Sequence, residues 1–194
     1  MLPFSFIRRE APVLEGERVS LRSPQTSHYR EWSQLRAVSR DFLEPWEPRW
    51  ALDELSGAAW RARIQHYRQE QARGTLMPFL IFEKTSGRLV GGITLGNIRY
   101  GVSRSAHLGY WIGLPYAGQG FMTDTVKTLS RFTFDKLKLH RIEAACIPKN
   151  IRSIRVLEKA GFQREGLLHS YLKINGRWQD HYLYARVETD LPPA

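Results

Sequence analysis

The chain has 194 residues, of which 42% are hydrophobic and 25% charged, a composition typical of a folded globular protein and not of a disordered one. It has no apolar run of about 18 residues that would cross a membrane, no basic signal-peptide start, and one cysteine, Cys146, so it forms no internal disulfide. These features predict one domain in a reducing cytoplasm, and the net charge of +10 favours either an anionic partner, such as nucleic acid, the ribosome or a phosphorylated cofactor, or simply a well-solvated surface.

The first third of the chain predicts one strand and two helices. Residues 1–16 contain scattered proline and glycine and predict an irregular arm. Alternating polar and apolar residues predict a strand at 18–22, and apolar residues at every third position predict a helix over 26–39. A second helix is expected over 53–73, with Asp53 as its N-cap.

The rest of the chain alternates strands and helices. Strands are expected at 77–83, 89–95, 106–113, 141–147, 163–174 and 177–187, and helices at 118–138 and 150–160. The pair Asn175-Gly176 is a strong hairpin signal between the last two strands. This order predicts a single α/β domain with one mixed sheet, helices on its faces and a core over about 18–187.

A glycine pair at the start of the 118–138 helix points to an anion site. Gly118 and Gly120 have no Cβ, so the backbone can approach a ligand closely. Free N–H groups and the helix dipole favour an anion such as a pyrophosphate at this position. A tight turn explains the same Gly-x-Gly pattern, so both interpretations stay open for this segment alone.

Motifs downstream of the glycine pair are more specific when taken together. Asn150 is a good N-cap for the 150–160 helix, Ser153 follows three positions later, and Gly161 suits a left-handed helix exit. Read together, four segments in this order resemble the GNAT acetyltransferases over residues 18–187: Gly118-Gln119-Gly120, His140-Arg141-Ile142-Glu143, Asn150-x-x-Ser153 and Ala160-Gly161-Phe162.

Three further segments resemble the RimJ/RimL branch of that family, which acetylates the N-terminal amine of ribosomal proteins. They are residues 42–48, 108–113 and 176–181. The resemblance implies a GNAT-like acyl-CoA N-acyltransferase fold, in which the strand at 110–112 splays away from the strand at 143–146. It also implies acetyl-CoA as co-substrate, without a metal.

The resemblance further implies a role for individual residues. The pantetheine arm of acetyl-CoA would lie in the opening of the sheet, with Asn150 holding its amides and Ser153 assisting the departing thiolate. A backbone N–H of the strand would polarise the thioester carbonyl. Trp46, Glu47 and Asn97 would contact the acceptor. The residues expected to bind the cofactor are Tyr110, Trp111, Ile112, Gly118, Gln119, Gly120, Phe121, Met122, Thr123, Asn150 and Ser153.

The chain departs from the family pattern at the general acid and base. It has His107 where many relatives have a carboxylate, and Leu157 where many have a tyrosine acid. Glu47 and His107 are the candidate bases, although a loop-surface acid and a structural strand histidine explain them as well. An α-amine, with a pKa of about 7.7–8.0, needs less help to become neutral than a lysine amine near 10.4, which favours an N-terminal acceptor.

The remaining reactive residues have structural explanations. Cys146 lies in a core-like strand and is expected to be a buried thiol, so we expect direct attack of the amine and no acyl-cysteine intermediate. Asp180-His181 is interpreted as a structural bond or a pocket wall, because no serine stands at a telling distance.

Three functions and two oligomeric states stay open at this level. The first function is acetylation of a protein N-terminus, such as that of a ribosomal protein, with the basic surface in contact with the ribosome. The second is acetylation of a small amine such as a polyamine, an antibiotic or an amino acid. The third is a basic RNA-binding module without turnover. The protein is expected to be a monomer or a homodimer.

Overall fold

The chain folds around one eight-stranded sheet. The computed structural model describes residues 11–190, and the strand order in its sheet is β1-β2-β3-β4-β5-β6-β8-β7. All neighbouring strands are antiparallel except β5 and β6, which are parallel. The strands are β1 (Leu14–Glu15), β2 (Val19–Arg22), β3 (Met77–Glu83), β4 (Leu89–Arg99), β5 (Ser105–Ile112), β6 (Arg141–Cys146), β7 (Gln163–Ile174) and β8 (Arg177–Val187).

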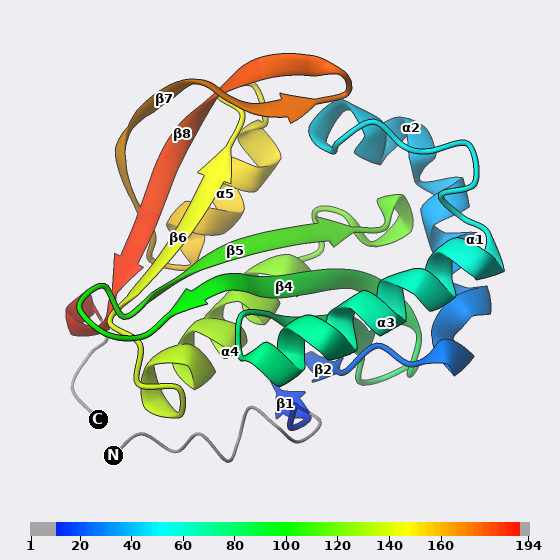
Figure 1. Cartoon of the computed structure of the whole chain (residues 1–194), viewed down its shortest axis with the longest axis horizontal. Helices are drawn as coiled ribbons and strands as arrows, with labels where there is room; N and C mark the ends of the chain where they lie inside the picture. The colour runs from blue at the N-terminus through cyan, green and yellow to red at the C-terminus, as the bar shows by residue number, and fades with distance from the viewer. Residues whose placement is uncertain (1–10, 191–194) are drawn as a thin grey trace.

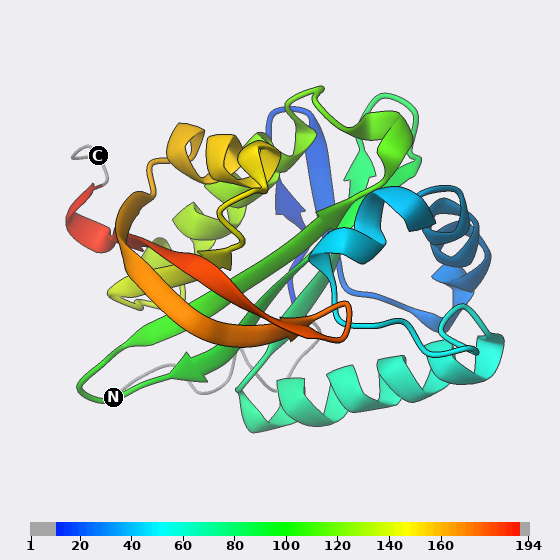
Figure 2. The ribbon, with the colours of Figure 1, turned by 90° about the horizontal axis from the view of Figure 1, so that it is seen from above.

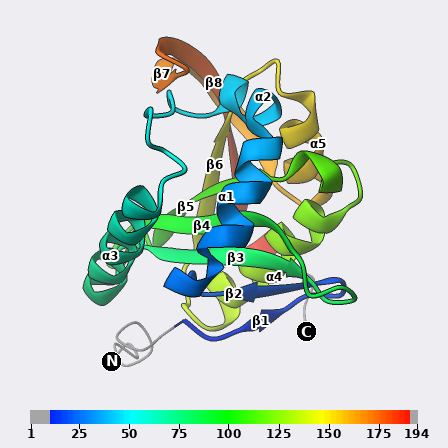
Figure 3. The ribbon, with the colours of Figure 1, turned by 90° about the vertical axis from the view of Figure 1, so that its right-hand side faces the viewer.

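Helices cover both faces of this sheet, as the sequence predicted (Figures 1 and 2). One face carries α4 (Phe121–Asp135) and α5 (Ile151–Lys159), and the other carries α1 (Tyr29–Val38) and α3 (Gly57–Arg73). Figure 3 shows the sheet between these two layers. The short helix α2 (Arg40–Leu43) continues from α1 towards the tip of the β7–β8 hairpin. Short 3-10 turns occupy Thr26–His28, Glu44–Trp46, Leu114–Tyr116 and Glu188–Asp190.

Two apolar clusters hold these layers together. The larger lies between the sheet and helices α4 and α5, where Phe121, Val126 and Leu129 are buried against strand residues such as Ile93. The smaller lies under α1 and α3, where the rings of Trp32 and Trp60 pack 4.6 Å apart. Both tryptophans are buried and belong to the core.

The sheet opens in its middle. Strands β5 and β6 pair only over Ser105–His107 and Arg141–Glu143, at the beginning of both strands. Beyond this register β5 bonds to β4 alone, as far as Ile112, and β6 bonds to β8 as far as Cys146. The splayed sheet expected from the family resemblance is therefore confirmed, and the two diverging strands are visible in Figure 1.

Several predicted boundaries are confirmed and others are wrong, since β4 continues past the predicted 89–95 to Arg99 and α4 spans only Phe121–Asp135 of the predicted 118–138. Asn175 and Gly176 adopt positive φ in the β7–β8 turn, and Gly161 does so after α5. The N-cap of α3 is Ser56 and not Asp53, because the Ser56 side chain accepts from the Ala59 N–H. The predicted arm is not irregular throughout, since Leu14–Glu15 pairs with β2, while residues 1–10 lie outside the described range.

Candidate active site

A cleft of about 740 Å³ occupies the opening between β5 and β6. Segments far apart in sequence form its wall: the start of α4, the start of α5, the splayed ends of β5 and β6, the loop after α2, and β8. Twelve of the predicted site residues line it, namely Trp46, Glu47, Tyr110, Trp111, Ile112, Gly118, Gly120, Phe121, Met122, Thr123, Asn150 and Ser153. The fold therefore gathers most of the residues that the sequence singled out around one cavity.

The start of α4 has the backbone geometry of an anion cradle. Gly118 and Gly120 have φ values of 77° and 88°, in the left-handed region that favours glycine. Gly120 is the N-cap and makes no side-chain capping bond, so the N–H groups of the first turn, from Phe121 to Thr123, have no intrahelical partner. Partnerless amides and a positive dipole end suit a pyrophosphate.

An arginine that the sequence analysis missed lies beside this cradle. The Arg18 guanidinium donates to the Gln119 carbonyl over 2.6 Å and lies 4.4 Å from the centre of the Phe121 ring. Asp124 in the first turn of α4 accepts from the backbone N–H of Arg18 over 2.8 Å, which ties the residue before β2 to the helix. A fixed positive charge therefore stands next to the amides of the cradle.

The start of α5 positions a second polar cluster. The Asn150 side-chain oxygen accepts from the Ser153 N–H over 3.1 Å, so Asn150 is the N-cap and only its amide NH2 is left for a ligand. The Ser153 hydroxyl lies 2.8 Å from the Tyr110 hydroxyl. Burial raises the pKa of Tyr110, so its phenol stays protonated and remains a hydrogen-bond donor.

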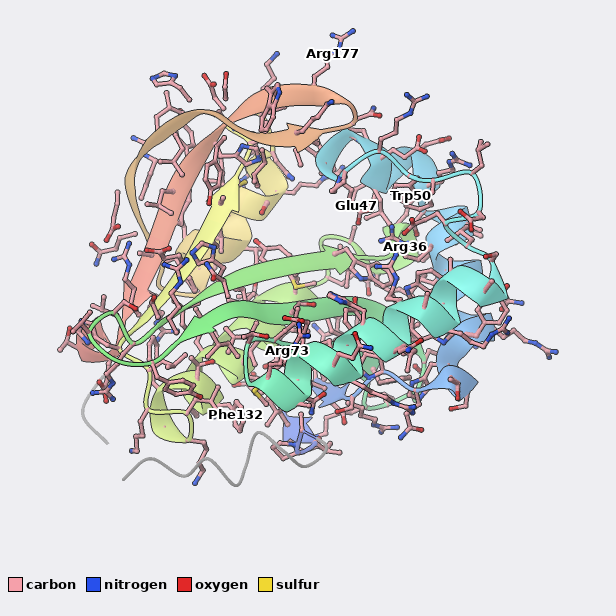
Figure 4. All side chains as sticks on the ribbon, in the orientation of Figure 1. Arg36, Glu47, Trp50, Arg73, Phe132 and Arg177 are labelled. Carbon is pink, nitrogen blue, oxygen red and sulfur yellow. The ribbon has the colours of Figure 1, made fainter. Side chains whose placement is uncertain are left out.

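The loop after α2 is held by an ion pair inside the protein. Both oxygens of the Glu47 carboxylate accept from Arg36, over 2.8 and 2.6 Å, and Trp50 Nε1 donates to one of them over 2.8 Å. Figure 4 shows these three side chains converging where α1 meets the loop. The Asn175 N–H donates to the Glu47 carbonyl over 2.9 Å, which joins the loop to the β7–β8 turn. Both carboxylate oxygens of Glu47 are therefore hydrogen-bonded within the cleft wall.

Three predicted residues lie elsewhere among the described residues. His107 Nε2 lies 2.8 Å from the Glu143 carboxylate, at the paired end of β5 and β6. Asn97 sits in the bulge of β4, with φ of 49°, and accepts from Arg99. Gln119 does not line the cleft, because its side chain donates to the Pro115 carbonyl over 2.7 Å.

Cys146 lines the cleft as a buried thiol, and burial raises its pKa. Thiolate, the nucleophilic form, is therefore scarce near neutral pH. We expect Cys146→Ala to keep kcat within about threefold of wild type, because the amine attacks directly. Steady-state assays of both proteins check this, and a complete loss of turnover with unchanged cofactor affinity would contradict it.

Comparison with known proteins agrees with this geometry. A family model described as "Acetyltransferase (GNAT) domain" matches residues 18–163. The chain is 35% identical to the probable N-acetyltransferase YjcK of Bacillus subtilis, over 92% of this chain and 98% of the relative. It is 32% identical to the [ribosomal protein uS5]-alanine N-acetyltransferase of Escherichia coli, over 81% of each chain.

A solved structure extends the likeness to three dimensions. Mycobacterium smegmatis RimJ in complex with CoA-disulfide superposes with a TM-score of 0.90 at 33% identity, over 100% of this chain and 93% of that one. The resemblance to the RimJ/RimL branch is thereby confirmed. With the splayed sheet, the glycine cradle and a family match over most of its length, the chain belongs to the GNAT acetyltransferase family and is an N-acetyltransferase.

Proposed function

We propose that the protein transfers the acetyl group of acetyl-CoA to the N-terminal α-amine of a protein, by direct attack of the amine in a ternary complex. The observation that carries this proposal is the single cleft that joins the glycine cradle to the Trp46–Glu47 loop through the opening of the sheet. The end of the cleft at the glycine cradle suits acetyl-CoA, and the end at the Trp46–Glu47 loop suits the acceptor amine. The relative from Escherichia coli, named for an alanine acceptor on a ribosomal protein, supports this acceptor class.

The residues at the glycine end of the cleft fit acetyl-CoA. The amides from Gly118 to Thr123 would bind the pyrophosphate, with the Arg18 charge beside them. The Asn150 amide NH2 would donate to a pantetheine carbonyl, because the oxygen of the same side chain is occupied by the helix cap. Tyr110, Trp111 and Ile112 lie on the splayed part of β5 and would border the pantetheine arm.

A proton donor for the leaving thiolate is present in the Tyr110–Ser153 pair. When the Tyr110 phenol donates to Ser153 Oγ, the Ser153 proton is free to turn towards the departing sulfur. Burial raises the pKa of Tyr110, so the phenol keeps this donating role over the working pH range. We assign Ser153 the role of assisting the thiolate and Tyr110 the role of orienting Ser153.

The acceptor end combines an aromatic side chain with an anionic group. Trp46 is 37% exposed and lies next to Glu47, whose carboxylate pairs with Arg36 on the cleft wall and would face the ammonium group of the acceptor. The net charge of +10 favours encounter with an acidic partner such as the ribosome surface. An N-terminal amine also needs roughly 3–4 kcal/mol less assistance than a lysine amine to become neutral, at 1.36 kcal/mol per pKa unit.

A comparison of three acceptors tests the proposal. The protein is incubated with acetyl-CoA and an alanine-started peptide, a lysine peptide with a blocked N-terminus, or spermidine, and free CoA thiol is measured. We expect kcat/KM for the alanine-started peptide to exceed the other two by at least about tenfold, a difference of 1.36 kcal/mol in transition-state binding. A preference for spermidine would overturn the proposed acceptor and leave the family activity intact.

A further inference from the structure

A buried histidine on β8 lies on the wall of the cleft. His181 is only 3% exposed, yet it lines the same cavity as Trp46, Glu47 and Trp111. The alternation of β8 places Tyr182 and Tyr184 against the apolar cluster under α4 and α5, so His181 points to the opposite face of the sheet. That face is the one covered by α1 and α3, on the side of the Trp46–Glu47 loop.

The hydrogen bonds of the ring fix its tautomer. Nδ1 lies 2.9 Å from the Gln179 carbonyl oxygen, which can only accept, so Nδ1 carries the proton. In a neutral imidazole the other nitrogen, Nε2, then holds a free lone pair. Within residues 11–190, Nε2 makes no hydrogen bond.

The orientation of the ring is held by the β7 bulge. Tyr171 packs edge-on against His181, with ring centres 5.8 Å apart at 72°. The bulge that brings Tyr171 there is fixed by Asp180, whose carboxylate accepts from the Ser170 N–H over 2.8 Å and faces His169 Nδ1 at 3.4 Å. The lone pair at Nε2 is thus presented by a ring with little freedom to turn.

The other acid–base groups near the acceptor end are occupied. Glu47 binds Arg36 and Trp50, and His107 lies against Glu143 away from the cavity. The titratable groups that interact with His181 are Asp180 on its own strand and Tyr171 on β7. The other titratable and charged residues that line the same cavity are Glu47, Tyr110, Tyr116, Cys146, Lys149, Arg152, Arg155 and Lys159.

We propose that His181 is the general base of the transfer. As the amine nitrogen attacks the thioester carbon and the new C–N bond forms, one proton passes from nitrogen to His181 Nε2. The C–S bond then breaks, its electron pair leaves with sulfur, and the thiolate takes a proton from Ser153, which is reprotonated from solvent. His181 releases its proton to water. This inference rests on the proposed function, since the base must meet an amine at this end of the cleft.

Substitution by asparagine isolates the role of Nε2. Asn in place of His181 keeps a donor near the Nδ1 position for the Gln179 carbonyl but has no base beyond it. We expect His181→Asn to lower kcat/KM for the alanine-started peptide by about 100-fold or more, the usual contribution of a general base. The dissociation constant for acetyl-CoA should not change. The matched control is His66→Asn, an exposed histidine on α3 that does not line the cleft, which should keep wild-type kinetics.

A second readout separates a chemical role from a structural one. His181→Ala opens space for an added base, so imidazole should restore part of its turnover in a concentration-dependent way. The pH profile of kcat/KM should change shape in both His181 variants, because the base that the wild-type protein uses is gone. Wild-type rates in His181→Asn, or a loss that imidazole does not restore and that leaves the pH profile unchanged, would overturn the inference. If the wild-type protein did not acetylate the alanine-started peptide at all, the proposed function would be overturned instead.

Discussion

Gly120→Val is expected to raise the dissociation constant for acetyl-CoA by about 100-fold, which corresponds to about 3 kcal/mol. Gly120 has φ of 88°, a conformation that a β-branched residue adopts only with strain, so the backbone will shift away from it. A shifted first turn no longer aims its amides at one point, and each hydrogen bond lost to a charged group costs about 1.5–3 kcal/mol. Titration calorimetry with CoA measures the change directly.

A matched glycine distinguishes this effect from general strain. Gly101, in the β4–β5 turn, has φ of 84° and nothing within 4 Å of an added Cβ, so Gly101→Val carries the same backbone penalty far from α4. It should lower the melting temperature to a similar extent as Gly120→Val while leaving the affinity for CoA unchanged. Equal affinities in the two variants would mean that the start of α4 is not the phosphate site.

The part of the fold that could be predicted from the sequence is the part that short segments encode. The left-handed glycines of the α4 cradle, the Asn150 cap and the Asn175-Gly176 turn each depend on the conformational preference of one or two residues, and such preferences are readable locally. The predicted start of α3 was wrong because local preferences alone do not choose between two suitable cap residues. Asp53 and Ser56 are both good caps, and only the packed structure selects Ser56.

The part of the site that could not be predicted depends on partners that are distant in sequence. Arg18 reaches the Gln119 carbonyl across 101 positions, and Tyr110 reaches Ser153 across 43. The interpretation of Asp180-His181 left a structural bond and a pocket wall open, and both occur, since Asp180 accepts from the Ser170 N–H of β7 and His181 lines the cleft. No local signal in the sequence shows that Nε2 of this histidine has no hydrogen-bond partner among the described residues. Residue type and spacing show which chemistry is available, while the topology decides which group has a free lone pair.

Arg36→Ala is expected to destabilise the protein by about 3–5 kcal/mol, because it leaves the Glu47 carboxylate partly buried without its counter-charge. Arg36 is 6% exposed, makes two bonds to Glu47, and has its guanidinium 4.3 Å from the centre of the Trp50 ring and 5.0 Å from that of Trp111. For a chain of this length, each kcal/mol lowers the melting temperature by about 2–4 °C. The expected decrease is therefore about 6–20 °C, measured by circular dichroism.

The neighbouring ion pair provides the control. Arg40 and Glu44 lie on the adjacent turn of the same segment, with side chains 55% and 31% exposed, so Arg40→Ala should cost at most about 1 kcal/mol. The double variant Arg36→Met/Glu47→Leu removes both buried charges and should recover most of the stability that Arg36→Ala loses. Equal melting temperatures for Arg36→Ala and Arg40→Ala would contradict the view that this pair holds the loop.

The same pair connects stability to the choice of acceptor. In the double variant the loop keeps its apolar packing but loses the Glu47 carboxylate together with its counter-charge, so a folded protein should bind acetyl-CoA normally and show a raised KM for the peptide. If Glu47 were itself the base, kcat would fall by about 100-fold or more instead. A raised KM with nearly unchanged kcat would assign Glu47 to holding the ammonium form of the acceptor, and would leave proton removal to His181.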